Sequence, residues 1–256
     1  MIGSFIFNDV ESDDFNLVCK SVKRPLLPAV KVKRVELSGT SGVYDFDTYD
    51  TEYSMRSITM KIQYIGTSYE ELRSRARSIS SWLSTNTWSK LRIHDEDDKY
   101  YLAKVTEEID LGSLWEAGTA DIVFDCQPFA YSVNEGVEEI IEITSLTNHD
   151  FNNPGTRLID YKSPQGSKFK IILDGSWSTL SLTMNGKTLN YPESGSGILI
   201  FDNVEMECTL GEVNKFSVLT GDIDTFLKII PGDNTLTING TSLNLDATIE
   251  YIPLWI

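Results

Sequence analysis

The sequence predicts two successive folds, an α+β domain over residues 1–132 and an all-β sandwich over residues 133–256. Three observations predict this division. A helical pattern occurs in the first half and not in the second, short alternating strands fill the second half, and Pro128 directly follows the last strand of the first. With 41% hydrophobic residues among 256, the chain has enough apolar surface for two cores of ordinary size.

The first half begins its regular pattern with a strand over residues 58–64, where apolar and polar side chains alternate. A helix follows over residues 68–83, because apolar residues recur there at steps of three and four. Ser68 and Glu71 have the spacing of a capping box, in which each side chain satisfies a free N–H of the other residue.

Two further strands with an acidic turn between them are predicted over residues 91–105. The last strand of this domain covers residues 120–126 and places Phe124 and Cys126 on its inward face. Pro128 cannot donate to a strand ladder, so the segment FDCQPFAY marks the end of the domain. Cys126 is therefore expected to be a packed thiol at a domain boundary.

The second half shows alternation over residues 169–173, 180–184, 204–210 and 243–251. Asn185-Gly186 directly follows one of these strands, and this dipeptide strongly favours a tight hairpin. Short strands separated by turns indicate an antiparallel sandwich of roughly 120 residues.

The composition restricts the possible functions. A net charge of −16 opposes binding to DNA phosphates or anionic lipid. The start of the chain lacks a signal peptide pattern and no apolar stretch reaches 18 residues, so we expect synthesis in the cytosol. Cys19, Cys126 and Cys208 are odd in number and widely spaced, which predicts unpaired, buried thiols.

Catalytic motifs are missing from the sequence. His94 and His149 are its two histidines, and no nucleophile elbow, zinc-protease, P-loop or dinucleotide motif occurs. The acidic segments 45–52 and 95–98 offer oxygen ligands for a hard cation, but neither has the EF-hand pattern, and solvated carboxylates explain them as well. We therefore expect no enzyme activity, no metal and no cofactor.

Two surfaces suggest binding. An acidic sandwich with aromatic side chains is compatible with a carbohydrate-binding module for host cell-wall glycans, and Trp177 is the candidate contact, unless it is an ordinary core residue. Basic residues are concentrated in segment 20–34, and they either face water or meet acidic groups on another copy of the chain.

The order of several features resembles one family. The features are Phe5 and Phe7, the turn with Gly39 and Gly42, the strand at 56–58, the helix end at 81–83, the hairpin over 91–105, segment 124–132, and the turns at 153–156 and 231–234. Together they resemble the distal tail proteins (Dit family) of long-tailed, non-contractile bacteriophages of Gram-positive bacteria.

The resemblance implies a structural protein of the virion, made in the host cytoplasm. Its N-terminal domain would be a β-sheet belt with one main helix that forms a hexameric ring around a channel for DNA. Its C-terminal domain would be a galectin-like β-sandwich. The ring would join the tail tube to the tail-associated or fibre protein, and receptor-binding proteins attach to some relatives. Within this expectation, Arg73, Arg75 and Arg77 contact acidic groups of a neighbouring subunit.

Overall fold

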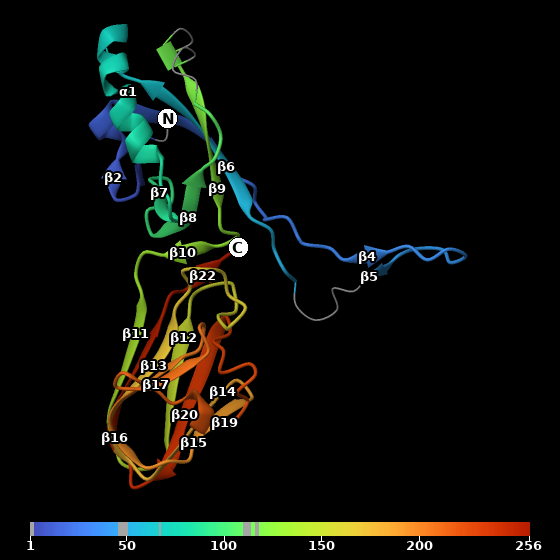
Figure 1. The fold of residues 1–256 in the computed structure, drawn as a ribbon, viewed down its shortest axis with the longest axis vertical. Coiled ribbons are helices and arrows are strands. Elements are labelled where there is room, and N and C mark those ends of the chain that lie inside the picture. The colour runs from blue at the N-terminus through green and yellow to red at the C-terminus, as the bar shows by residue number, and fades with distance from the viewer. Residues whose placement is uncertain (1–2, 46–50, 67, 110–113, 116–117) are drawn as a thin grey trace. The chain divides into compact units, whose positions relative to one another are not determined.

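The computed structural model describes residues 3–45, 51–66, 68–109, 114–115 and 118–256. The chain forms two compact units, Met1–Ala130 with Ile256 and Tyr131–Trp255. The sequence placed the boundary after residue 132, two residues beyond the start of the second unit. The described residues are mostly β-strand, with one α-helix in the first unit (Figure 1).

The first unit is built on an antiparallel sheet in the order β2-β1-β7-β8-β9-β6-β3. Its strands are β1 (Phe5–Phe7), β2 (Val10–Glu11), β3 (Leu17–Lys23), β6 (Arg56–Tyr64), β7 (Ser89–Ile93), β8 (Lys99–Val105) and β9 (Ala120–Cys126). A separate bridge pairs Gly3 with Cys19 of β3, through hydrogen bonds of 2.7 and 3.3 Å. The segment that leads into β1 thus lies beside β3, so the sheet curls back toward its own beginning.

Helix α1 (Tyr69–Leu83) is the predicted helix. One of the two hydrogen bonds of the predicted capping box forms at its N-terminus. The N–H of Glu71 donates to the Ser68 hydroxyl at 3.2 Å, which satisfies one of the free donors of the first turn. The Glu71 carboxylate does not complete the box; it accepts from Asn16 at 3.4 Å and pairs with Arg75 at 3.5 Å. The carboxylate ties the first turn to the residues that precede β3.

Trp82 fixes the other end of α1 to the sheet. Its ring stacks on Phe15 at 4.7 Å and on Phe5 at 5.6 Å, and it meets Phe7 edge-on at 6.3 Å. Its indole N–H donates to the Phe7 carbonyl at 2.8 Å. A buried aromatic ring of this size contributes large apolar area, and its one polar atom is satisfied.

The second unit consists of two antiparallel sheets, ordered β11-β21-β13-β16-β17-β18 and β12-β20-β14-β15-β19. The strands of the first are β11 (Gly136–Ile143), β13 (Phe169–Trp177), β16 (Gly195–Asp202), β17 (Glu207–Leu210), β18 (Val213–Asn214) and β21 (Asn244–Tyr251). Those of the second are β12 (Thr147–Asn153), β14 (Thr179–Met184), β15 (Lys187–Tyr191), β19 (Thr220–Gly221) and β20 (Gly232–Thr241). Four further short elements are η1 (Ser12–Phe15), η2 (Phe216–Val218), β10 (Ala130–Ser132) and β22 (Leu254–Trp255).

Aromatic pairs join the two sheets. Phe151 of β12 meets Tyr251 of β21 with ring centroids 5.5 Å apart, and Trp177 of β13 meets Tyr191 of β15 at 6.0 Å. Each pair crosses from one sheet to the other, so the unit is the two-layer sandwich that alternation predicted.

The hairpin β14–β15 turns at Asn185-Gly186, as the sequence predicted. Both residues have positive φ, 49° and 75°, which two-residue hairpin turns with the twist of the strands require. The Asn185 amide also donates to the Lys228 carbonyl at 2.9 Å, so this turn is held to a neighbouring loop.

The predicted strand over residues 204–210 is wrong in its first half. Val204–Met206 form a turn, and β17 begins at Glu207. The Asp202 carboxylate accepts from the N–H groups of Val204 and Glu205, at 3.2 and 3.1 Å, and Met206 has a φ of 56°. Aspartate binds its own following backbone in this way and competes with strand pairing, which alternation alone does not reveal.

We predict that Trp82→Ala lowers the free energy of unfolding of the first unit by about 3–5 kcal/mol, because it removes a buried ring and leaves the Phe7 carbonyl without its donor. Urea unfolding followed by circular dichroism measures the change. Trp115→Ala is the matched control, since Trp115 is exposed and packs on Tyr69 alone among the described rings. Equal losses for the two variants would contradict the role given to Trp82.

Candidate functional site

Residues 24–45 and 51–55, here called the arm, leave the sheet between β3 and β6 (Figure 1). Arg24 stands at its base and pairs with both Asp95 and Glu96, each at 3.2 Å. Pro25 follows and has no N–H to donate, so the ladder of β3 ends there. Partly exposed ion pairs contribute at most about 1 kcal/mol each. The main effect of these ion pairs is to fix the point at which the chain leaves the sheet.

The acidic turn at residues 95–98 is therefore not simply solvated, as the sequence had suggested. Arg24 binds two of its carboxylates. His94 Nδ1 lies 2.8 Å from Asp97, and Lys99 pairs with Asp98 at 2.9 Å. Hydrogen bonding to Lys99 holds the pKa of Asp98 below its ordinary value. The turn is a network of opposite charges that joins the β7–β8 hairpin to the arm.

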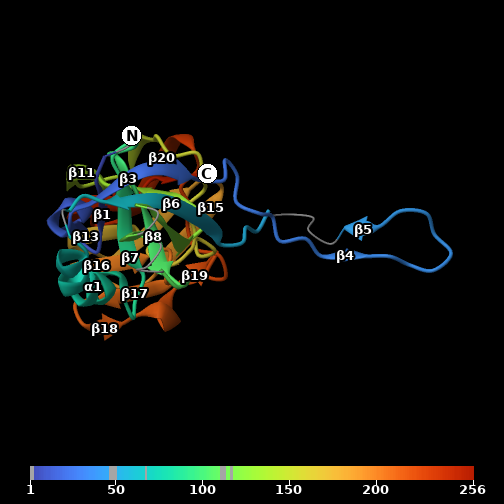
Figure 2. The same ribbon diagram turned by 90° about the horizontal axis from the view of Figure 1, so that it is seen from above.

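The arm is a narrow two-stranded ribbon. Near its base, Lys31 N donates to the Glu52 carbonyl at 2.9 Å and Ser54 N to the Ala29 carbonyl at 2.7 Å. Farther out, β4 (Arg34–Val35) pairs with β5 (Tyr44–Asp45) as a sheet of two strands. Figures 1 and 2 both show β4 and β5 lying apart from the body of the first unit. A hairpin of two strands is marginally stable in water by itself.

Half of the large apolar side chains exposed in the described part of the chain belong to the arm. They are Leu26, Leu27, Val30, Val32, Val35, Leu37, Val43, Tyr44 and Met55. Leu26 is 89% exposed and Leu27 61%. Scattered apolar residues on a surface are ordinary, but a concentration of them on one projecting segment marks a contact surface.

The structure separates the three arginines of α1. Arg73 and Arg77 are exposed, one turn apart, and neither has an ion pair within the described residues. Arg75 points to another side of the helix, where its guanidinium donates to the Asp14 carbonyl at 3.2 Å and pairs with Glu71. Two of the three side chains are thus available to another molecule, and the third links α1 to η1 of its own chain.

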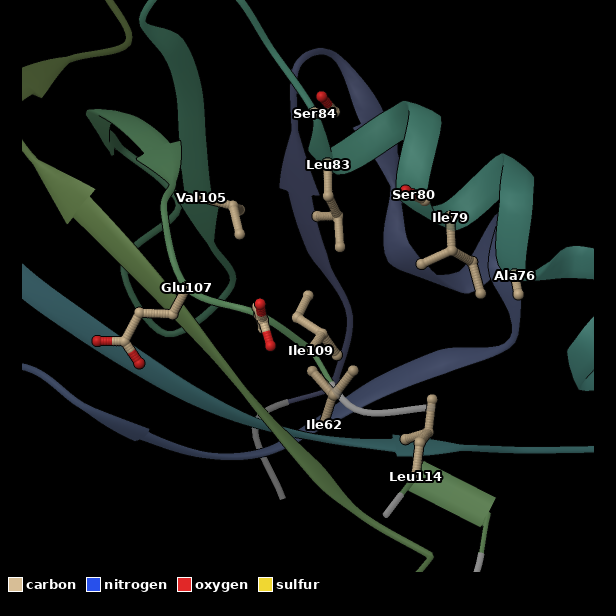
Figure 3. A pocket seen from close by; sticks show the side chains of 11 residues that line it. Ile62, Ala76, Ile79, Ser80, Leu83, Ser84, Val105, Glu107, Ile109 and Leu114 are labelled. Atoms are coloured by element: carbon tan, nitrogen blue, oxygen red, sulfur yellow. The ribbon is translucent and has the colours of Figure 1, made fainter. Parts of the chain in front are cut away.

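A groove of about 340 Å³ runs beside α1 (Figure 3). Its apolar wall is formed by Ile62, Ala76, Ile79, Leu83, Val105, Ile109 and Leu114. Ser80, Ser84, Glu107 and Glu108 also line it and are exposed, so the groove reaches the surface. Figure 3 shows Ala76, Ile79 and Leu83 of the helix facing Ile62 of β6 across it. No local sequence pattern predicts this groove, because its walls come from three separated segments.

All three cysteines are buried, as expected, and each is free. Burial raises the pKa of Cys19 to about 11 and that of Cys208 to about 12, and it raises the pKa of Cys126 still further. The Cys126 thiol donates weakly to the Phe124 carbonyl at 3.6 Å. A thiol that is both covered and protonated is a poor nucleophile, so Cys126 is a packing residue.

Trp177 does not present a surface for stacking on a sugar. Its side chain is 3% exposed, its ring meets Tyr191, and its indole N–H donates to the Glu193 carbonyl at 3.1 Å. A glycan could reach the ring only if this part of the sandwich opened. The structure therefore offers no support for the glycan contact expected at this residue.

No group of three or more potential metal ligands is found among the described residues. Of the acidic segment 45–52, Asp47 and Asp50 lie outside the described residues. Within the described chain, no helix combines the length and the apolar character needed to cross a membrane.

The alternation that begins at Val30 predicts a strand with its basic side chains on one face. In the structure Val30 forms an isolated bridge with Tyr53, and β4 covers Arg34–Val35. Pro25 and Pro28 are the sequence signal for the departure from the sheet, since proline is excluded from the interior of a sheet. Apolar residues between prolines, with no partner strand nearby in sequence, indicate a segment that leaves its own core.

Comparison with known proteins gives two findings. Residues 14–126 match the family model described as the phage tail protein RIFT-related domain. The whole chain has the fold of the Dit protein of phage SPP1, with a TM-score of 0.74, 13% sequence identity and 100% of both chains covered. That protein is described as a paradigm of the hub adsorption apparatus in phages that infect Gram-positive bacteria.

Weaker likenesses link the chain to the baseplate of phage p2 in its activated conformation. The structure with strontium gives a TM-score of 0.49 at 11% identity, with 98% of both chains covered. The structure with calcium gives 0.45 at 11% identity, with 99% of this chain and 98% of the other covered. No curated protein sequence matches the chain.

We predict that a maleimide added to the native protein labels none of the three cysteines within the time that labels an exposed thiol, because all three are covered and protonated. Mass spectrometry counts the labels, and three should appear after unfolding. Leu27→Cys supplies the exposed thiol for comparison and should react at once. Labelling of Cys126 in the folded protein would contradict its assignment as a packing residue.

Proposed function

We propose that this chain, with a phage tail domain over residues 14–126 and the Dit fold over its whole length, is a structural hub protein of a phage tail tip. Its first unit assembles into a hexameric ring with a central channel for DNA. The ring joins the tail tube to the tail-associated or fibre protein and so takes part in host adsorption. The protein is made in the host cytoplasm and resides in the virion.

The family match carries this proposal, because it covers most of the unit that would form the ring. The likeness to SPP1 Dit extends it, since the match covers 100% of both chains. A shared fold at 13% identity does not by itself transfer a partner or a copy number. Those parts of the proposal depend on the surface of this chain.

The arm supports self-assembly. It exposes large apolar side chains on a ribbon that has no core of its own. Burying one such side chain contributes about 1.5–3 kcal/mol, so covering several of them against a second subunit would stabilise an assembly substantially. Arg73 and Arg77 add exposed charge on α1, which sets the register of a contact more than its affinity.

The second unit would be a galectin-like sandwich carried on the ring, and receptor-binding proteins are its expected partners. No nucleic acid is bound specifically in this proposal. A chain with 38 acidic and 22 basic residues repels DNA phosphates on balance, which suits a conduit through which DNA passes without adhering. The proposal assigns the protein no catalytic activity and no cofactor.

Light scattering of the purified protein tests the assembly. We expect a mass near six times the 28.8 kDa of one chain, and ring-shaped particles with a central opening in negative-stain electron micrographs. Measurements over a range of concentrations, with and without the tail tube protein, distinguish a weakly associating ring from a protein that does not assemble. A chain that stays monomeric under all these conditions would refute the proposal.

We predict that reversing Arg73 and Arg77 to glutamate weakens ring assembly at least about tenfold, because like charges placed together at an interface are costly. The dissociation midpoint by light scattering measures the effect. Arg75→Ala is the control. This residue is bound within its own chain, so the variant should assemble normally and lose at most about 1 kcal/mol of folding stability. If the variant with both arginines reversed assembled as well as the unchanged protein, Arg73 and Arg77 would not lie at the interface.

A further inference from the structure

The groove beside α1 is an apolar surface with an acidic edge. Leu83 and Ile79 of the helix and Ile62 of β6 give it buried apolar walls, while Glu107 and Glu108 stand exposed at its rim (Figure 3). It also lies beside the C-terminal turns of α1, whose last turn contains no basic residue. The carbonyl end of a helix carries partial negative charge, so the groove favours an apolar occupant with positive charge.

The first strand of the arm has this character. Leu26, Leu27, Val30 and Val32 are exposed apolar residues, and Lys31, Lys33 and Arg34 lie among and after them. This strand thus combines several strongly exposed apolar side chains with basic residues. We propose that the first strand of the arm of one copy docks in the groove beside α1 of a second copy.

In this structure the arm does not occupy the groove of its own chain. It joins β6 just before Arg56, whereas the groove contacts β6 at Ile62, about 20 Å farther along the strand. Figures 1 and 2 both show the arm leaving the first unit on the side away from α1. We therefore assign the groove to the arm of a second copy.

The two surfaces lie on different parts of the unit, so the contact is head-to-tail. Such a contact leaves one arm and one groove free on every pair, and repetition closes a ring when the rotation between subunits allows it. An extended strand over residues 24–39 spans up to about 50 Å, which is enough to bridge neighbouring units. This inference rests on the proposed ring and specifies which residues join its subunits.

Disulfide trapping between two different variants, each with one introduced cysteine, tests the contact. One partner is Leu26→Cys, Leu27→Cys, Val30→Cys or Val32→Cys, and the other is Ser80→Cys in the groove. Mixing the two proteins under mild oxidation should give a crosslinked dimer for at least one arm position. Because the native cysteines are buried, they do not contribute. A link between two separate variants has to be intermolecular.

Ser78→Cys is the matched control, since Ser78 is an exposed serine on the same helix that lines a shallow hollow with Trp82 and not the groove. The inference requires crosslinks to position 80 and none to position 78. Equal crosslinking at both, or none at position 80 in a protein that light scattering finds assembled, would overturn it and leave the proposed ring standing. A protein that never assembles overturns both.

A charge exchange gives an independent test. Glu107→Lys with Glu108→Lys, and separately Lys31→Glu with Lys33→Glu, should each weaken assembly at least about tenfold. Combining the four substitutions in one chain should restore most of the assembly. The groove rim is then basic and the arm acidic, so the two surfaces attract each other again. Losses that simply add in the combined variant would overturn the pairing of these surfaces.

Discussion

The attachment of α1 to its sheet through Trp82 is the interaction on which the first unit depends. The ring lies between Phe5, Phe7 and Phe15, which come from the first fifteen residues, and its N–H donates to the backbone of β1. One residue thus joins the first fifteen residues of the chain to the end of α1. The exposed arginines and the groove are both carried on α1, so their positions follow from this anchor.

The arm differs from this body, because most of its large apolar side chains are exposed and lie outside the core. Proline ends the ladder of β3, and the charge network around Arg24 fixes the direction in which the chain leaves. The same unit therefore contains a rigid body, whose stability is internal, and a ribbon whose stability depends on what covers it. A free energy of folding measured on an isolated subunit would leave out the second part.

Local patterns predicted the local structure well. Alternation located β6, β9 and β13, and Asn185-Gly186 fixed a hairpin, because each signal lies within a few residues. One strand was predicted too long because the deciding interaction was a competing local bond, that of Asp202 with the backbone that follows it. The groove could not be read from the sequence at all, since its walls meet only after folding. The family resemblance, based on the order of features, anticipated the fold of the whole chain.

The burial of all three thiols has a consequence for the life of a phage protein. Such a protein is made in a reducing cytosol and, after lysis of the host, functions in an oxidising medium. Cys19, Cys126 and Cys208 present no accessible thiolate to oxidants in that medium. In the proposed role, the subunit would pass from one redox environment to the other with its covalent structure unchanged, because no accessible thiolate is present to react.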